Sequence, residues 1–214
     1  MELVAKSLER SLKGRLLYSG LDFHLRPGMK IVVQGASGAG KSQLLRHLSG
    51  LDAERAGELE MEGTLSLGKR SFSEWGACTW RREVSYTPQQ VPRLSGTPEE
   101  FLARMQGFKA QVGRLGSNAQ HLGRDLGLEA SHWQQPWSEL SVGERQRALL
   151  SIFIAREPAV LLLDEPTAAL DPDSVLAVEA LLHDRACIWV THHAGQAERL
   201  ADELITVGAK PSAE

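Results

Sequence analysis

The chain has 214 residues, which is enough for one large domain, or for one domain with an inserted lobe, and for a sizeable core. Its formal net charge of −3 argues against a broad basic face, so we expect no nucleic-acid partner. The chain lacks a signal-peptide pattern and any run of the ~20 apolar residues that span a bilayer, so we expect a soluble protein that meets a membrane only through a partner.

The N-terminal part of the chain predicts short β-strands. Residues 3–5 and 21–25 have strand composition on either side of a turn at Gly14. Over residues 57–67, apolar and polar side chains alternate on both sides of Gly63. This alternation indicates a small antiparallel piece with one face in water.

A glycine-rich segment lies between an apolar run at residues 30–34 and an apolar helical pattern at 43–48. Strand, glycine loop and helix follow in the order of a phosphate-binding P-loop, whose N–H groups turn toward an anion beside a helix dipole. Lys41 would reach the β- and γ-phosphates, and the Ser42 hydroxyl would hold Mg²⁺. The alternative interpretation is a plain glycine-rich turn before a helix. The candidate binding residues are Gly35, Ala36, Ser37, Gly38, Ala39, Gly40, Lys41, Ser42 and Gln43.

The middle of the chain changes from strand to helix patterning. Residues 84–87 predict a strand, after which apolar residues recur at helical spacing through residue 138. Thr97, followed by Pro-Glu-Glu, predicts the N-cap of a helix in this region. We therefore expect one domain with an α/β core over 1–88 and 139–214 and a helical lobe over 89–138.

After the lobe, strands and helices alternate as in a βαβ series. The run at 159–163 is apolar throughout and predicts a central parallel strand. Cys187 lies in another apolar run, where a buried free thiol is expected, and Cys78 is too distant for a shared metal site. The expected elements are helices over 143–155, 173–182 and 195–201 and strands over 159–163, 187–190 and 203–207.

Two acidic residues, Asp164 and Glu165, end the apolar strand. An aspartate at the carboxyl end of a parallel strand beside a P-loop is placed to hold Mg²⁺ through water. The following glutamate could orient and polarise the water that attacks the γ-phosphate. A strand-end acid that only caps the next turn is the alternative, and it accounts poorly for two carboxylates.

Further short motifs follow the glycine loop in one order. They are Gln89, residues 140–147 (LSVGERQR), 164–167 (DEPT), 169–171 (ALD) and 191–192 (TH). With them the sequence resembles an ABC-type ATPase, the nucleotide-binding subunit of ABC transporters, in which they are the Q-loop, signature, Walker B, D-loop and H-loop. The resemblance implies an α/β fold with a P-loop NTPase (RecA-like) core, a mixed sheet, an antiparallel β piece and an inserted α-helical lobe.

The resemblance also implies how the site works. A head-to-tail homodimer would close on ATP and Mg²⁺, with Lys41 and Ser42 from one copy and Ser141 and Gly143 from the other. Asp171 would lie at that interface. The implied catalytic residues are Glu165, His192, Gln89 and Lys41, and the implied metal-binding residues are Ser42, Gln89 and Asp164. The helical lobe would meet a polytopic membrane permease on a separate chain, at the cytoplasmic face of the membrane.

Two positions depart from the family pattern. Val142 replaces the usual middle glycine of the signature, which we expect to be tolerated because Ser141 and Gly143 carry the phosphate-facing atoms. The aromatic residue that normally stacks on adenine should fall near Leu12, which is not aromatic. Tyr18 is the nearby ring, with core packing as its other interpretation. We therefore expect weak discrimination between ATP and GTP.

Several conspicuous side chains have ordinary structural explanations. We expect an exposed His193 and a solvated pair of arginines at 81–82. His132, Trp133 and Trp137 are expected to pack within the lobe or to face a partner.

The leading functional hypothesis is the ATP-hydrolysing subunit of a small ABC transporter. Its compactness and the segment before Gln89 are similar to stand-alone metal (iron) export ATPases, and lipoprotein-release and efflux types stay open. The alternatives are a non-transport ABC ATPase, such as an assembly factor for iron–sulfur clusters or a nucleic-acid enzyme, and an inactive nucleotide-binding scaffold. The scaffold is disfavoured because Lys41, Asp164, Glu165 and His192 are all present.

Overall fold

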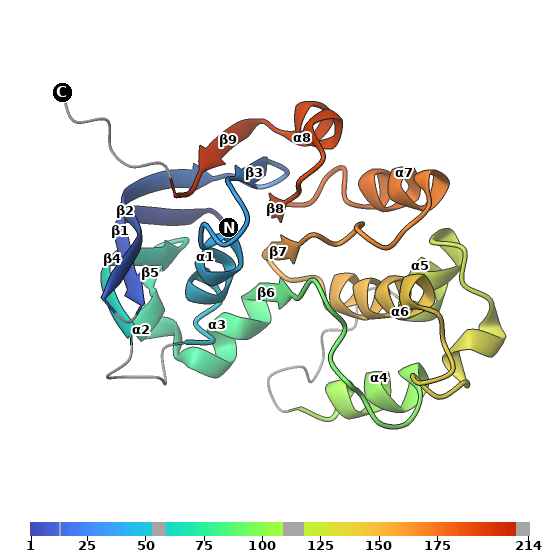
Figure 1. Ribbon diagram of the computed structural model, residues 1–214. Helices are drawn as coiled ribbons and strands as arrows, with labels where there is room; N and C mark the ends of the chain where they lie inside the picture. Colours follow the sequence, from blue (N-terminus) through green and yellow to red (C-terminus); the bar gives the residue numbers. More distant parts are fainter. Residues whose placement is uncertain (13, 53–58, 109–117, 209–214) are drawn as a thin grey trace.

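The computed structural model describes residues 1–12, 14–52, 59–108 and 118–208 (Figure 1). Its strands form one antiparallel sheet and one separate parallel sheet. The parallel and antiparallel pairings that we expected in a mixed sheet therefore occur in two different sheets. The elements, in order, are β1 (Leu3–Leu12), β2 (Arg15–Leu25), β3 (Lys30–Gln34), α1 (Lys41–Leu48), β4 (Leu59–Leu67), β5 (Arg70–Ser71), α2 (Phe72–Trp75), α3 (Ala77–Glu83), β6 (Val84–Thr87), α4 (Pro98–Gln106), α5 (Ala119–Asp125), η2 (Ala130–Trp133), α6 (Val142–Ala155), β7 (Val160–Asp164), α7 (Pro172–Leu181), β8 (Cys187–Val190), α8 (Ala194–Leu200) and β9 (Glu203–Thr206).

The antiparallel sheet has the strand order β2-β1-β4-β5. Its first two strands are longer than predicted, because the ladder between β1 and β2 continues to Leu12 and Arg15. Register shifts interrupt that ladder, and Ser7 has a positive φ of 49°, so the apolar alternation that marks a strand is broken. Gly63 lets β4 pass close to β1, since a Cβ there would lie 2.5 Å from the Ser7 carbonyl oxygen. The first two residues of the predicted 57–67 segment lie outside the described residues.

The parallel sheet has the strand order β6-β7-β8-β3-β9. All four of its strand pairings are parallel. The strand that precedes the glycine loop therefore lies between β8 and β9, and the carboxyl ends of the strands meet at one edge. That edge receives the segments that follow β3, β6, β7 and β8, which contain the glycine loop, Gln89, Glu165 and His192.

Helices cover both faces of the parallel sheet. On one face α1 lies between it and the antiparallel sheet, and Leu44, Leu45 and Leu48 are fully buried there (Figure 1). On the other face, apolar residues of α6, α7 and α8 pack on the alternate side chains of the strands, Leu161 and Trp189 among them. No described helix is long and apolar enough to cross a bilayer.

The described part of residues 89–138 contains α4, α5 and η2. Thr97 caps α4 as predicted, with its hydroxyl accepting from the Glu100 N–H. Trp133 and Trp137 are 2% exposed and pack with α6, which confirms their structural interpretation. Short helices α2 and α3 and strand β5 were not anticipated. The division into core and lobe stays a proposal.

Candidate nucleotide-binding site

The glycine loop connects β3 to α1, and hydrogen bonds join its end to its beginning. The Lys41 ammonium donates to the carbonyl oxygens of Gly35 and Ala36, at 2.8 and 3.0 Å. Gly40 is the N-cap of α1, with a φ of 105° that an L side chain rarely adopts. Gly35 has a φ of 151°, and a Cβ there would collide with the Val207 carbonyl oxygen. Glycine is therefore required at both ends of the loop.

A buried ion pair anchors the start of α1 to the antiparallel sheet. Arg10, in β1, is fully buried and donates to the backbone oxygen of Gln43 at 2.8 Å and to its side-chain oxygen at 3.0 Å. It also pairs with Asp52 at 2.8 Å, and Arg46 reaches the same carboxylate at 2.9 Å. Burial alone raises the pKa of Asp52, but the hydrogen bonds from Arg46 and Arg10 outweigh it and lower the pKa. The first turn of α1 is thereby held in place.

Tyr18 belongs to the core and not to the nucleotide site. It is 7% exposed, its ring stacks on the His47 ring at a centroid distance of 6.2 Å, and its hydroxyl lies 2.7 Å from His47 Nδ1. Burial, and then the positive charge of Arg10, lower the pKa of His47 to about 4. The imidazole is therefore neutral at pH 7, and its Nδ1 can accept the hydrogen bond that the Tyr18 hydroxyl donates.

A cavity of about 420 Å³ lies beside the glycine loop and brings the sequence-predicted residues together. Glu165 is its central acid: its carboxylate lies 2.7 Å from His192 Nε2 and accepts from the Gln89 amide at 3.1 Å. Glu165 has a φ of 47°, which is strained for a non-glycine residue and typical of functional sites. The lining residues are Leu12, Arg15, Leu17, Ser37, Gly38, Gly40, Lys41, Ser42, Gln43, Gln89, Glu165 and His192.

Asp164 lies behind the cavity, at the end of β7, and is 3% exposed. The hydroxyl of Tyr86, on the neighbouring strand β6, donates to its carboxylate at 3.0 Å. Burial, and then the charge of Asp164, raise the pKa of Tyr86, so the phenol keeps its proton. The sequence analysis did not anticipate this contact of Tyr86 with a candidate site residue, which follows from the parallel pairing of β6 with β7.

A buried amide links the two loops that contain Glu165 and His192. Gln196 is 3% exposed, and its side-chain oxygen accepts from the Thr191 hydroxyl at 2.7 Å. Its amide nitrogen donates to the Thr167 hydroxyl at 3.1 Å and to Glu179 at 2.9 Å. Because Thr167 follows the Walker B acids and Thr191 precedes the histidine, Gln196 restrains both loops. No sequence signal singled it out.

The signature and D-loop residues do not line the cavity of their own chain. The Ser141 hydroxyl accepts from the Glu144 N–H and caps α6. The Asp171 carboxylate accepts from the N–H and hydroxyl of Ser174, at 2.9 and 2.6 Å, and these bonds lower its pKa. A Cβ on Gly143 would lie 3.3 Å from the Ala169 carbonyl oxygen, so the two motifs adjoin each other.

The residues for which we expected ordinary structural explanations have structural contacts or are exposed. His193 is exposed, as predicted. Arg81 is not simply solvated, because its guanidinium donates to the Gly50 carbonyl oxygen at 2.8 Å. Cys187 is buried and Cys78 is exposed, both as free thiols.

Comparison with known proteins identifies the family of this chain. The family model described as "ABC transporter" matches residues 18–168. The aliphatic sulfonates import ATP-binding protein SsuB 1 of Rhizobium johnstonii is 31% identical over 206 residues, covering 94% of this chain and 71% of that protein. The nickel import ATP-binding protein NikO of Rhodobacter capsulatus is 32% identical over 222 residues, covering 95% of this chain and 84% of that protein.

Solved structures show the same fold. The ATP-binding subunit of an ABC transporter has a TM-score of 0.78 at 24% identity, over 97% of this chain and 86% of that one. A dimeric bacterial ABC transporter cassette has a TM-score of 0.76 at 20% identity, over 96% of this chain and 94% of that one. The expected fold class is therefore confirmed. The chain belongs to the ABC transporter family and is one of its ATP-binding, ATP-hydrolysing subunits.

Proposed function

We propose that this subunit hydrolyses Mg²⁺-bound ATP to drive transport through a membrane permease encoded as a separate chain. The observation that carries the proposal is the position of Glu165, which contacts both Gln89 and His192 at the edge of the glycine-loop cavity. A carboxylate held there can orient a water toward the terminal phosphate. His192 holds the carboxylate in position and adds a hydrogen-bond donor beside it.

The oxygen donors at the site fit Mg²⁺. Ser42 and Gln89 line the cavity with oxygen-bearing side chains, and the Gln89 side-chain oxygen remains beside the amide that donates to Glu165. Mg²⁺ is usually held by one or two protein oxygens together with phosphate oxygens and waters. Ser42 and Gln89 would provide these protein ligands, and Asp164 would hold the ion through a water molecule.

The active unit would be a head-to-tail homodimer. Ser141 and Gly143 stand at the N-terminus of the 14-residue helix α6 but line no part of the cavity of their own chain. Val142 between them is 57% exposed, so the signature segment is open to a second molecule. A second copy would bring this helix end onto the triphosphate, and two sites would result from the symmetry.

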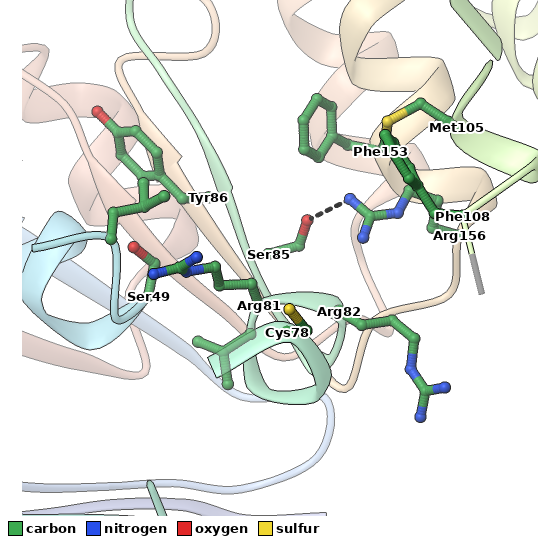
Figure 2. Close-up of a pocket in the computed structure, with 12 residues that line it drawn as sticks. Ser49, Cys78, Arg81, Arg82, Ser85, Tyr86, Met105, Phe108, Phe153 and Arg156 are labelled. Carbon is green, nitrogen blue, oxygen red and sulfur yellow. Dashed lines mark hydrogen bonds between the residues drawn. The ribbon is translucent and has the colours of Figure 1, made fainter. Parts of the chain in front are cut away.

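The permease would dock in a groove of about 540 Å³ between the α/β core and the helical region (Figure 2). One wall has Met105, Phe108 and Phe153, and the opposite wall has Arg81 and Arg82 from α3. We infer an amphipathic cytoplasmic segment as its occupant, with its apolar side chains against Met105, Phe108 and Phe153. On the opposite wall, Arg81 donates to the Gly50 carbonyl oxygen and Arg82 pairs with Glu83 at 2.6 Å. The subunit would thus lie at the inner face of the membrane.

The names of two relatives concern the direction of transport. SsuB 1 and NikO are described as import proteins, so they do not support the metal-export subtype. The likeness to an Atm1-family exporter, at 19% identity, shows only the fold. Neither these relatives nor the site favours the assembly-factor alternative.

Replacement of Glu165 by Gln tests the proposed function. We expect retained ATP binding, ATP turnover reduced by about 100-fold or more, and a nucleotide-loaded dimer that persists in size-exclusion chromatography. Glu62→Gln, an exposed carboxylate on β4, is the matched control and should behave as the wild type. Undiminished turnover in the Glu165 variant would exclude this residue from catalysis. Co-purification of a polytopic membrane protein from detergent-solubilised cells tests the permease separately.

A further inference from the structure

The cavity beside the glycine loop extends beyond the residues that hold phosphate. Its far part is formed by the tip of the β1–β2 hairpin, where Leu12 and Arg15 face each other as the last pair of the ladder. Leu17 connects this tip to the loop, because a Cβ on Gly40 would lie 3.2 Å from the Leu17 Cβ. The hairpin tip and the glycine loop therefore line the same cavity.

The arrangement determines which part of a nucleotide lies against the hairpin. The loop and Lys41 hold the phosphates, and the terminal phosphate must lie toward Glu165 for hydrolysis to occur. The nucleoside then leaves the loop on the side of Leu12, Arg15 and Leu17. A nucleobase has a flat π-face that an apolar wall or a cation can cover.

Arg15 is suited to that role. Its side chain is exposed and makes no hydrogen bond or ion pair with any other residue that the structure describes. No Phe, Tyr or Trp among the described residues lines the cavity, and Tyr18 is committed to His47 in the core. The guanidinium is consequently the planar group available to cover a base, with Leu12 and Leu17 as the apolar wall.

We propose that Arg15 is the base-binding residue of this ATPase, whose guanidinium lies on the face of the nucleobase in place of an aromatic ring. This inference rests on the proposed nucleotide site. A contact to the face of the ring reads neither the 6-amino group of adenine nor the 6-oxo group of guanine. The subunit therefore binds ATP and GTP with affinities within about 5-fold of each other.

Competition against a fluorescent ATP analogue tests the assignment, with ATP, GTP and inorganic tripolyphosphate as competitors. Arg15→Ala should weaken ATP and GTP alike, by about 5-fold, and leave tripolyphosphate unchanged. Arg15→Trp should restore most of the ATP affinity, because an indole offers a face of its own. Arg26→Ala, an exposed arginine in the turn after β2, is the matched control and should leave all three competitors unchanged.

Three results would overturn the proposal. If Arg15→Ala weakens tripolyphosphate as much as ATP, the guanidinium binds phosphate and not the base. If Arg15→Ala has no effect on either nucleotide, the base lies elsewhere. If the wild type prefers ATP over GTP by more than about 5-fold, an edge contact reads the base. Failure of the proposed function itself is distinct, because it would appear as undiminished turnover in Glu165→Gln and not in these binding measurements.

Discussion

The partly buried His47–Tyr18 pair predicts that stability depends on pH through one histidine. The His47 pKa is lowered from its ordinary 6.5 to about 4, so between these values the unfolded chain binds a proton that the folded chain does not. The stability contribution is therefore complete above pH 6.5 and declines as the pH falls toward 4. At about pH 4.5 the linkage amounts to about 2.5 kcal/mol, and about 2 kcal/mol remains after allowance for the partly exposed ring.

His47→Asn removes the titration while leaving a side-chain oxygen near the Tyr18 hydroxyl. Urea unfolding of both proteins at about pH 7.5 and about pH 4.5 should show that the wild type loses about 2 kcal/mol more on acidification than the variant. The comparison cancels other acid-sensitive groups, such as Asp52, that both proteins share. Equal losses in the two proteins would show that His47 is not held neutral by burial, and would refute the reasoning.

Two further predictions concern the site itself. Lys41→Ala removes the ammonium that the loop holds at 2.8 Å from the Gly35 oxygen, and it should raise the dissociation constant for ATP by about 10- to 100-fold in equilibrium dialysis. Unchanged affinity would contradict a phosphate contact. Gln196→Leu breaks the link between the Thr167 and Thr191 hydroxyls, so steady-state kinetics should show kcat reduced by about 10-fold with little change in KM. A pure fall in protein stability without a change in kcat would exclude the positioning role.

Much of the fold could be predicted because several elements are locally specified. The apolar runs at β3 and β8 coincide with the predicted strands, and Thr97 with Pro98 marks the start of α4 by its own capping bonds. The β1–β2 hairpin was underestimated for a physical reason. Its bulges interrupt the two-residue alternation, and the pairing with β4 that stabilises those residues is a long-range interaction.

The sequence by itself determined the chemistry of this protein: a glycine loop with lysine and serine, two acids at the end of an apolar strand, and a glutamine and a histidine that each follow another strand. These motifs are short and local, so their residue types reveal them. Only the tertiary structure decided which residues contact the motif residues and which ones line the cavity. Parallel pairing brings Gln89 and His192 onto Glu165, and packing withdraws Tyr18 from the cavity while it places Arg15 there. Such neighbours lie far apart in the chain, and they are set by how the sheets pack and not by any local pattern.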